Sequence, residues 1–382
     1  MKRSRLQTAQ PRTALRCIFS SYNGRVKTAD VIIAGGGIIG LSAALELAQK
    51  GFRVRVMERG RVMSEASWAA AGMLAAEDPT HPAELAELAT LSIHLYPEYL
   101  NTIERLSGRL VPLRTRATLQ TSGNDSGFHH HDTATCFAIS AQEAKRRIPG
   151  LASRSHSYLW LEEVSLDPRD LCAALPLAAA AAGVVLQENT EVLAVDGQDG
   201  WAEIRTGSGT VSAGAFINCC GAWAAKVQNL SLERPAAAVE PWKGQMMMVR
   251  LKPPLDLEYA LRTPEVYLVP RGGGRIAIGA TVERAGFDRR VEPSAVAWLR
   301  ALAAELWPPI ASAEAVESWT GLRPGTKDGL PLMGGAGQPH CWIATGHFRN
   351  GILLAPATGL IVRQLLEGNP PEVSLAAFNP AR

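Results

Sequence analysis

The chain has 382 residues, of which 47% are hydrophobic and 20% are charged. This composition is typical of a folded protein, and at roughly 100–200 residues per domain the length predicts two or three domains. The longest nearly apolar stretch, residues 31–45, contains four glycines. It is shorter than the roughly 20 residues that a membrane-spanning helix needs, so we predict no membrane span. The six cysteines lack paired Cys-x-x-Cys spacing, which predicts no metal site and favours a reducing cytoplasm.

The net charge of +3 hides an uneven distribution of charged residues. Residues 1–29 carry seven lysines and arginines and no acid, which leaves 32 basic and 36 acidic residues in the rest of the chain. Residues 30–382 therefore offer no electrostatic basis for binding nucleic acid. We expect the basic leader, residues 1–29, to be a disordered extension. The same composition also fits an organellar transit peptide or a mis-assigned start codon.

The first ordered unit is expected to begin at Asp30. Residues 31–34 are typical of a buried parallel strand, residues 38–50 have helical spacing, and residues 54–57 form a second strand that ends at Glu58. Further helices are expected over 82–107, from Ser140 to Pro149, from Asp167 to Gly183, over 293–306, and before Gly368. Further strands are expected at 184–187, 190–195, 201–205, 216–219, 241–251, 266–270, 275–280 and 315–320. A parallel unit followed by antiparallel segments predicts an α/β plus α+β protein with two lobes.

A glycine-rich turn follows the first strand. Gly35-x-Gly37-x-x-Gly40 opens the first helix, where glycines permit a tight turn and let the backbone approach a pyrophosphate at the helix N-terminus. Glu58 ends the next strand, where its carboxylate can accept hydrogen bonds from a ribose. Together these features predict a site for an ADP moiety, without separating NAD from FAD.

Two later segments bear on that choice. Residues 66–73 have small side chains, which would allow close approach of a bulky flat ligand, although a plain helix start explains them equally well. Residues 346–353 precede the last helix, whose first N–H groups would stabilise negative charge on a flavin ring.

At this point the sequence resembles the glycine oxidase family, the thiazole-pathway branch of the D-amino-acid oxidase superfamily of FAD enzymes. The resemblance covers residues 30–369, nearly everything except the leader. Five blocks carry it, in the family's order: Gly35-Gly36-Gly37-Ile38-Ile39-Gly40, Ala69-Ala70-Ala71-Gly72-Met73-Leu74, Lys243-Gly244-Gln245-Met246, Trp319-Thr320-Gly321-Leu322-Arg323-Pro324-Gly325-Thr326 and Gly346-His347-Phe348-Arg349-Asn350-Gly351-Ile352-Leu353.

The resemblance implies a cofactor site for FAD in a Rossmann-like domain of the GR2 type, with an antiparallel-sheet domain for the substrate. The implied cofactor-binding residues are Gly35, Gly37, Ile38, Ile39, Gly40, Glu58, Arg59, Ala66, Ser67, Ala71, Gly72, Met73, Val192, His347, Phe348, Arg349, Asn350, Gly351, Ile352 and Leu353. The FAD-binding domain is expected to comprise residues 30–80, 150–225 and 323–382, and the substrate-binding domain residues 81–149 and 226–322. No cysteine lies in residues 323–332, where sarcosine oxidase relatives tether their flavin, so we predict non-covalent FAD.

The resemblance further implies that Arg323 binds a substrate carboxylate, with Tyr267 and Arg349 close to it. The planar, always-charged guanidinium of an arginine suits a carboxylate. Each of these side chains also has a structural interpretation: a salt bridge for either arginine and a core-edge position for Tyr267. Two positions depart from the family pattern. Glu265 stands in place of a histidine and Val282 in place of a methionine, which puts the side-chain pocket in doubt.

The implied activity is oxidative deamination of glycine, sarcosine or D-alanine by hydride transfer to flavin N5. The products are an α-keto acid (glyoxylate from glycine), ammonia and, with molecular oxygen as acceptor, hydrogen peroxide. No side chain is predicted to act as a catalytic acid or base, and the resemblance implies a homotetramer. Two alternatives remain: a D-amino-acid or sarcosine dehydrogenase with a different electron acceptor, and a non-catalytic FAD-binding redox sensor or structural module.

Three conspicuous runs are given structural interpretations. His129-His130-His131 is expected in a solvated loop, Cys219-Cys220 in core packing, and Met246-Met247-Met248 in a wall or core.

Overall fold

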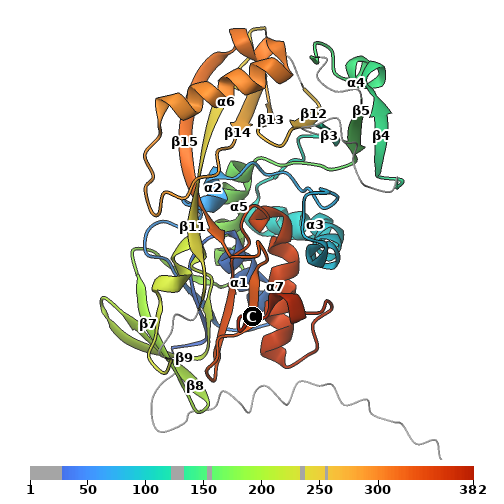
Figure 1. Ribbon diagram of the computed structural model, residues 1–382. Coiled ribbons are helices and arrows are strands. Elements are labelled where there is room, and N and C mark those ends of the chain that lie inside the picture. Colours follow the sequence, from blue (N-terminus) through green and yellow to red (C-terminus); the bar gives the residue numbers. More distant parts are fainter. Residues whose placement is uncertain (1–27, 122–132, 153–156, 233–236, 254–256) are drawn as a thin grey trace, which may run out of the picture.

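A computed structural model describes residues 28–121, 133–152, 157–232, 237–253 and 257–382. The first 27 residues of the basic leader and the triple-histidine segment lie outside these ranges. The described chain forms two sheets, and strand β11 (Glu240–Arg250) runs along the molecule from one sheet region to the other (Figure 1). Within the described residues, no helix is both long and apolar enough to cross a membrane.

The first sheet has nine strands, ordered β10-β7-β8-β9-β1-β2-β6, with the β16–β17 pair attached to β9. Its strands are β1 (Ala29–Ala34), β2 (Val54–Met57), β6 (Val185–Gln187), β7 (Val192–Gln198), β8 (Trp201–Thr206), β9 (Gly209–Asn218), β10 (Gln228–Asn229), β16 (Leu332–Gly335) and β17 (Cys341–Thr345). The strands β9, β1, β2 and β6 are parallel. Because β9 is long, its first half pairs with β8 and its second half with β17.

Four helices form the main hydrophobic core on one face of this sheet: α1 (Ile38–Gln49), α3 (Ala86–Ser107), α5 (Pro168–Ala181) and α7 (Gly351–Glu367). Helix α5 begins as its sequence predicts, because the Asp167 side chain accepts a hydrogen bond from the Arg169 N–H and Pro168 occupies the first turn. Helix α7 ends at Gly368, whose left-handed backbone suits glycine.

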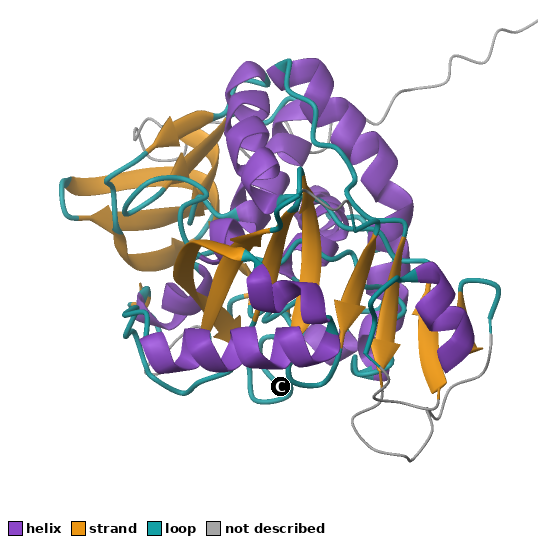
Figure 2. Ribbon diagram, turned by 90° about the horizontal axis from the view of Figure 1, so that it is seen from above, coloured by secondary structure: helices purple, strands orange, loops and turns teal. Residues whose placement is uncertain are grey.

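The second sheet has eight strands, ordered β15-β11-β14-β13-β12-β3-β5-β4. They are β11, β3 (Ala117–Thr121), β4 (Cys136–Ser140), β5 (Ser157–Leu161), β12 (Tyr259–Arg262), β13 (Tyr267–Gly272), β14 (Arg275–Gly279) and β15 (Glu314–Gly325). The sheet is antiparallel as predicted, except that β12 and β3 are parallel. Helix α6 (Pro293–Leu306) packs on it through Leu299, Ala303 and Leu306. Figure 2 shows the row of strands from above, with helices on either side.

Shorter elements connect these layers: α2 (Ala66–Ala69), α4 (Ala141–Arg147), and the 3-10 helices η1 (Ala83–Leu85), η2 (Gly221–Lys226), η3 (Pro308–Ser312) and η4 (Ala376–Phe378). The α/β plus α+β class is confirmed, and every helix expected from the sequence is present. Seven of the described strands have no counterpart among the expected elements: β3, β4, β5, β10, β12, β16 and β17. The division into two domains stays a prediction, and we propose two changes to it. Helix α3 packs in the core of the first sheet, and β5 pairs within the second sheet.

Helix α7 carries a proline in its interior, Pro356. Proline has no N–H, so the Ile352 carbonyl loses its helical partner. The Tyr96 hydroxyl, from α3, donates to that carbonyl. One turn away, the Ser92 hydroxyl donates to the Leu353 carbonyl at 2.6 Å and accepts from the Ala357 N–H at 3.3 Å. Helix α3 therefore supplies the bonds that α7 lacks near its N-terminal end.

Replacing the donor tests this account. Tyr96→Phe would leave the buried Ile352 carbonyl unpartnered and is expected to destabilise the protein by about 1–3 kcal/mol in denaturant unfolding. Adding Pro356→Ala restores a backbone N–H to the same carbonyl, so the double variant should recover most of the loss. Equal destabilisation of the single and double variants would contradict the account.

Candidate cofactor and substrate site

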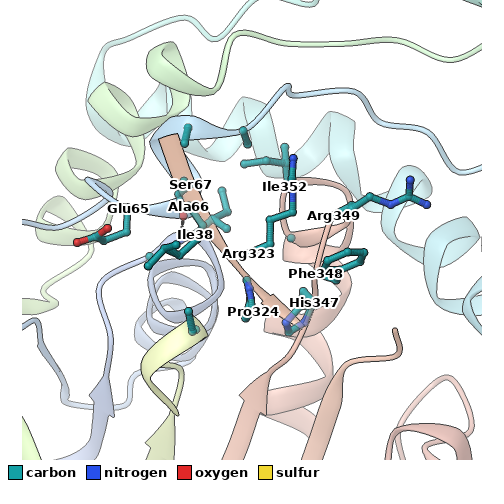
Figure 3. Close-up of a pocket in the computed structure, with 18 of the residues that line it drawn as sticks. Ile38, Glu65, Ala66, Ser67, Arg323, Pro324, His347, Phe348, Arg349 and Ile352 are labelled. Atoms are coloured by element: carbon teal, nitrogen blue, oxygen red, sulfur yellow. Dashed lines mark hydrogen bonds between the residues drawn. The ribbon is translucent and has the colours of Figure 1, made fainter. Parts of the chain in front are cut away.

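A single cavity runs between the two sheets and is lined by residues from both (Figure 3). It brings together nearly all the residues singled out from the sequence. Those that line it are Gly35, Gly37, Ile38, Ile39, Glu58, Arg59, Ala66, Ser67, Ala71, Gly72, Met73, Val192, Glu265, Tyr267, Val282, Arg323, His347, Phe348, Arg349, Asn350, Gly351 and Ile352. Gly40 and Leu353 do not line it.

The glycine turn leaves no room for side chains. Gly35 has a φ of +101°, and a Cβ there would lie 2.4 Å from the Cys219 carbonyl oxygen. A Cβ on Gly40 would lie 2.0 Å from the Gly35 carbonyl oxygen. Gly40 therefore serves the packing of α1 against the turn, and this brings the first turn of α1 to the cavity wall.

The first turn of α1 is open to the cavity. Its N-terminal residue, Gly37, supplies no side-chain cap. The Ile38 N–H donates to the Ser67 hydroxyl at 2.9 Å, which places Ser67 at the end of this helix. The remaining N–H groups and the helix dipole favour an anion there.

Glu58 lies beside the same turn and is buried. Its carboxylate accepts the Gly36 N–H at 2.8 Å and the Gly60 N–H at 2.9 Å. Each oxygen has a second lone pair that can accept a further hydrogen bond, and Glu58 lines the cavity, as binding of a ribose would require. Arg59 follows, with its guanidinium 3.7 Å from the centre of the Trp223 ring and 3.1 Å from Glu65.

The segment that follows α2 is fixed from the second sheet by Arg271, a residue that the sequence analysis did not single out. Its guanidinium donates to the carbonyls of Leu166, Ala70 and Ala71, the last at 2.6 Å. Burial lowers the pKa of Arg271 to about 10, so it stays charged at neutral pH. No local sequence signal marks this contact, because it joins residues 200 positions apart.

A second helix N-terminus faces the cavity at α7, where Asn350 makes no side-chain cap. Nearby, the buried His347 places Nε2 3.0 Å from the Thr358 hydroxyl, while Nδ1 has no hydrogen-bond partner among the described residues. Burial lowers the pKa of His347 to about 3, so the ring is neutral. Leu353 lies in the core behind this turn.

These features fit FAD. Two helix N-termini without side-chain caps, a glycine turn with no room for a Cβ at Gly35 or Gly40, and an unpartnered buried imidazole nitrogen meet at one cavity that is also lined by small side chains. The helix ends suit the charged parts of a dinucleotide, and the small residues suit a flat ring.

The opposite part of the cavity contains Arg323. Its Nη1 donates to the Thr281 carbonyl at 3.0 Å, and its guanidinium also donates to the Tyr267 hydroxyl. Among the described residues no carboxylate lies within ion-pair distance of it. Burial lowers the pKa of Arg323, and burial raises that of Tyr267 although Arg323 offsets part of the shift.

The remaining substrate candidates lie at the mouth. Glu265 is exposed and accepts a hydrogen bond from the Thr263 hydroxyl at 3.2 Å. Val282 is 54% exposed. Arg349 approaches the Thr80 hydroxyl at 3.4 Å.

Beyond Arg349 lies a buried charge cluster that the sequence analysis missed. Arg262 lies 3.5 Å from Asp78 and 3.3 Å from Glu163. Burial raises the pKa of Glu163 to about 7, and burial lowers that of the neighbouring His81 to about 4. These residues come from three separate segments, around residues 78–81, 163 and 262, so no local pattern could have grouped them.

The three conspicuous runs differ in their outcome. Cys219 and the three methionines lie in core clusters, while Cys219, Cys220 and Met246 also line the cavity. The triple histidine lies outside the described residues. Within those residues, no group of three His, Cys, Asp or Glu side chains is placed to hold a metal ion.

Comparison with known proteins places this arrangement in a family. Residues 30–365 match the family described as FAD dependent oxidoreductase. A glycine oxidase of Geobacillus kaustophilus is 36% identical over 92% of this chain and 97% of its own. Its solved glycine oxidase structure superposes with a TM-score of 0.86, at 35% identity, over 93% of this chain and 98% of that one.

A bifunctional ThiO/ThiG protein of Synechocystis is 33% identical over 93% of this chain, which spans about half, 54%, of that protein's length. The family match covers most of the chain, and its bounds include all the residues that line the cavity. The chain therefore belongs to the FAD dependent oxidoreductase family, as an FAD-dependent enzyme of the amine oxidase type related to the glycine oxidases.

Proposed function

We propose that the enzyme oxidises glycine and other small amino acids, such as sarcosine and D-alanine. From glycine, water and oxygen it would give glyoxylate, ammonia and hydrogen peroxide. The observation that carries this proposal is Arg323, a cation in the cavity wall with no carboxylate partner among the described residues. The name of the Geobacillus relative supports glycine as substrate.

Arg323 would bind the substrate's carboxylate. Its position is set by the Thr281 carbonyl and the Tyr267 hydroxyl, which leave other guanidinium N–H groups for an anion. Two charge-assisted hydrogen bonds at about 1.5–3 kcal/mol each would provide most of the affinity for so small a ligand. Arg349, at the mouth, would add a further positive charge near the same group.

Bound FAD would supply the acceptor for the hydride that leaves the substrate's α-carbon. The chain's own part is to hold the carboxylate so that this carbon faces the ring, and to exclude water from the buried end of the cavity. We assign no side chain as catalytic acid or base, since burial lowers the pKa of His347 to about 3 and that of His81 to about 4, which makes both rings weak bases with no extra proton to donate at neutral pH. The substrate's neutral amine provides the electron pair that makes the imine, and water then hydrolyses it.

Several finer properties belong to the same proposal. The two cysteines that line the cavity, Cys219 and Cys220, are held protonated because burial raises the pKa of both thiols, that of Cys220 to about 12, which supports non-covalent FAD. The ThiO/ThiG name of the Synechocystis relative supports a role in thiamine biosynthesis. A homotetramer in the cytoplasm follows from the family resemblance and the cysteine pattern, and light scattering would test the oligomeric state.

An anaerobic titration tests the proposal. The purified holoenzyme should release its FAD on denaturation, and glycine should bleach the oxidised-flavin band, which air should then restore. Bleaching that air does not reverse would indicate a dehydrogenase with a different acceptor. Bound FAD that no small amine reduces would indicate a non-catalytic module and overturn the proposal.

Removing the proposed carboxylate partner should weaken binding strongly. Arg323→Met is expected to raise the KM for glycine by about 10²- to 10⁴-fold, because two charge-assisted bonds are lost. A matched control is Arg116→Met, which removes an exposed arginine that pairs with Glu258. An unchanged KM in Arg323→Met would contradict this assignment.

Gly244 gives a second, independent test of Arg323. A Cβ there would lie 2.4 Å from both Nη1 and Nη2 of Arg323, so Gly244→Ala should displace the guanidinium. We expect KM to rise about tenfold or more, with the flavin spectrum retained. Gly207→Ala, where a Cβ meets nothing within 4 Å, is the control. Equal kinetics of the two variants would show that Arg323 can shift without consequence.

The pH profile should follow the substrate's amine. His347 and His81, with pKa values of about 3 and 4, stay neutral above pH 6, and the pKa of Tyr267 lies above its usual 10. The neutral amine fraction grows with pH, so kcat/KM should rise from pH 6 to 10 and the limb should move with the amine's pKa. Glu163, with a pKa of about 7, is an enzyme group that titrates within the same pH range, so its contribution to the profile has to be excluded. A limb that Glu163→Gln removes, or a flat profile, would contradict this prediction.

A further inference from the structure

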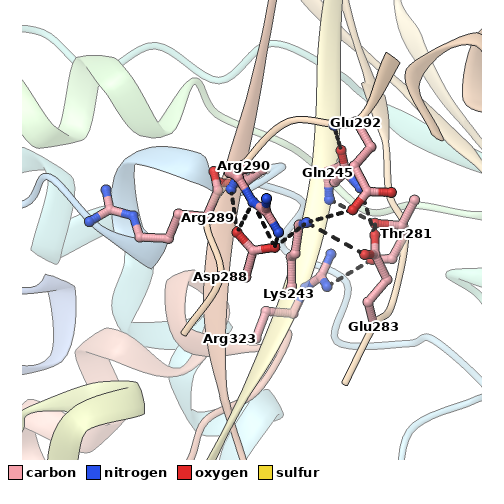
Figure 4. A network of polar contacts seen from close by, with 10 residues as sticks. Lys243, Gln245, Thr281, Glu283, Asp288, Arg289, Arg290, Glu292 and Arg323 are labelled. Atoms are coloured by element: carbon pink, nitrogen blue, oxygen red, sulfur yellow. Dashed lines mark hydrogen bonds and ion pairs between the residues drawn. The ribbon is translucent and has the colours of Figure 1, made fainter. Parts of the chain in front are cut away.

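Lys243 is a fully buried cation outside the cavity. Its side chain has no exposed surface, and its Nζ lies 3.5 Å from Glu292, 3.7 Å from Glu283 and 3.8 Å from Asp288 (Figure 4). A buried ammonium is costly without such partners. The three acids come from one segment, residues 283–292, which leaves the end of β14 and leads to α6. Lys243 therefore holds that segment against β11.

Lys243 and Glu283 face each other directly. Each donates its N–H to the other's carbonyl at 2.9 Å, as in an antiparallel pair. Successive residues of a strand point to opposite faces. Gly244 and Met246 line the cavity, so Lys243 and Gln245 lie on the other face of β11.

The Glu283 carboxylate is held by three groups on that face. It accepts hydrogen bonds from the Thr281 hydroxyl and from Gln245 Nε2, the latter at 2.9 Å, besides the ion pair with Lys243. Burial alone would raise the pKa of Glu283, but these three partners lower it below the usual value. Glu283 is thus a charged carboxylate with its lone pairs engaged.

Arg323 lies within electrostatic reach of Glu283 but does not pair with it. The negative charge of Glu283 acts to raise the pKa of Arg323. The guanidinium nevertheless donates its hydrogen bond to the Thr281 carbonyl, two residues before Glu283. The same short segment therefore offers Arg323 a neutral partner on one side and carries an acid that is turned to the other side.

We propose that Lys243 is a positioning residue for substrate binding: it keeps Glu283 on the far face of β11, so that Arg323 remains free for the substrate's carboxylate. This rests on the proposed function, in which Arg323 binds that group. A carboxylate released from Lys243 would compete with the substrate as an internal anion only two residues from the position that Arg323 already contacts. The network thus determines affinity for carboxylate ligands while touching neither substrate nor cofactor.

The test compares Lys243→Met, Glu283→Gln and the double variant as holoenzymes. Acetate, a carboxylate that cannot be deaminated, is titrated against the oxidised-flavin spectrum, and KM and kcat for glycine are measured alongside. Lys243→Met should weaken acetate and raise the KM by about tenfold or more, with kcat within about twofold. The double variant should return both values to within about twofold of the unaltered protein, because the carboxylate of Glu283, which lies two residues from the position that Arg323 contacts, is then absent.

Controls separate this from a structural role. Lys252→Met removes an exposed lysine that pairs with Glu314 and should change neither value. If Lys243→Met does not fold, the double variant is compared with Glu283→Gln alone: equal acetate affinity supports the proposal, and weaker binding by the double variant overturns it. Failure of the double variant to recover the loss in Lys243→Met overturns it as well.

The outcomes also distinguish this inference from the proposed function. If acetate binds the unaltered enzyme, Arg323→Met abolishes binding and Lys243→Met leaves it intact, only the role of Lys243 is wrong. If Arg323→Met binds acetate as tightly as the unaltered enzyme, the carboxylate assignment itself is wrong.

Discussion

The substrate end of the cavity depends on the pairing of β11 with β15 where two glycines oppose each other. Gly244 faces Gly321, and Trp242 faces Arg323 two residues along. A Cβ on Gly321 would lie 2.6 Å from the Cβ of Ala69, and one on Gly244 would strike the guanidinium of Arg323. Because both positions lack a side chain, α2 and the guanidinium of Arg323 can both pack against the same face of the sheet. A side chain at Gly321 would push against Ala69 of α2, and a side chain at Gly244 would displace the Arg323 guanidinium.

The cofactor end depends on a different constraint, two helix N-termini that reach one cavity without side-chain caps. Helix α1 is brought there by the turn at Gly35 and by the absence of a Cβ at Gly40. Helix α7 is interrupted by Pro356 within its second turn, and Tyr96 and Ser92 replace the hydrogen bonds that this interruption would cost. The unpaired backbone N–H groups at the N-termini of α1 and α7 are available to a ligand. The carbonyls of Ile352 and Leu353 in α7, by contrast, are paired by hydroxyl groups of α3.

Sequence alone predicted what is local. The glycine turn, Glu58, the capped start of α5 and the glycine end of α7 follow from neighbouring residues, and the family blocks brought Arg323 and Tyr267 to attention. The strands β3, β5 and β12 were not predicted, because short apolar runs carry little periodicity and the pairings are non-local: β12 pairs with β3 across 142 positions, and β3 pairs with β5 across 37 to 43. The contacts of Arg271 and of the Arg262 cluster were also not predicted, because they join residues that are far apart in the sequence. The exposure of Glu265 and Val282 depends on how a strand end is oriented, which spacing does not reveal.

Four buried or partly buried cations among the described residues divide according to their partners, and this division explains where an anion can bind. Lys243 and Arg262 are surrounded by carboxylates, which cancel their charge. Arg323 and Arg271 are held chiefly by carbonyl oxygens, with Asp167 at 3.9 Å as the nearest acid to Arg271. A carbonyl fixes the position of a guanidinium without neutralising it, whereas a carboxylate does both. Arg323 combines carbonyl anchoring with a place in the cavity wall, so its positive charge is directed at whatever anion enters. Burial strengthens that attraction, because little water is present to screen it.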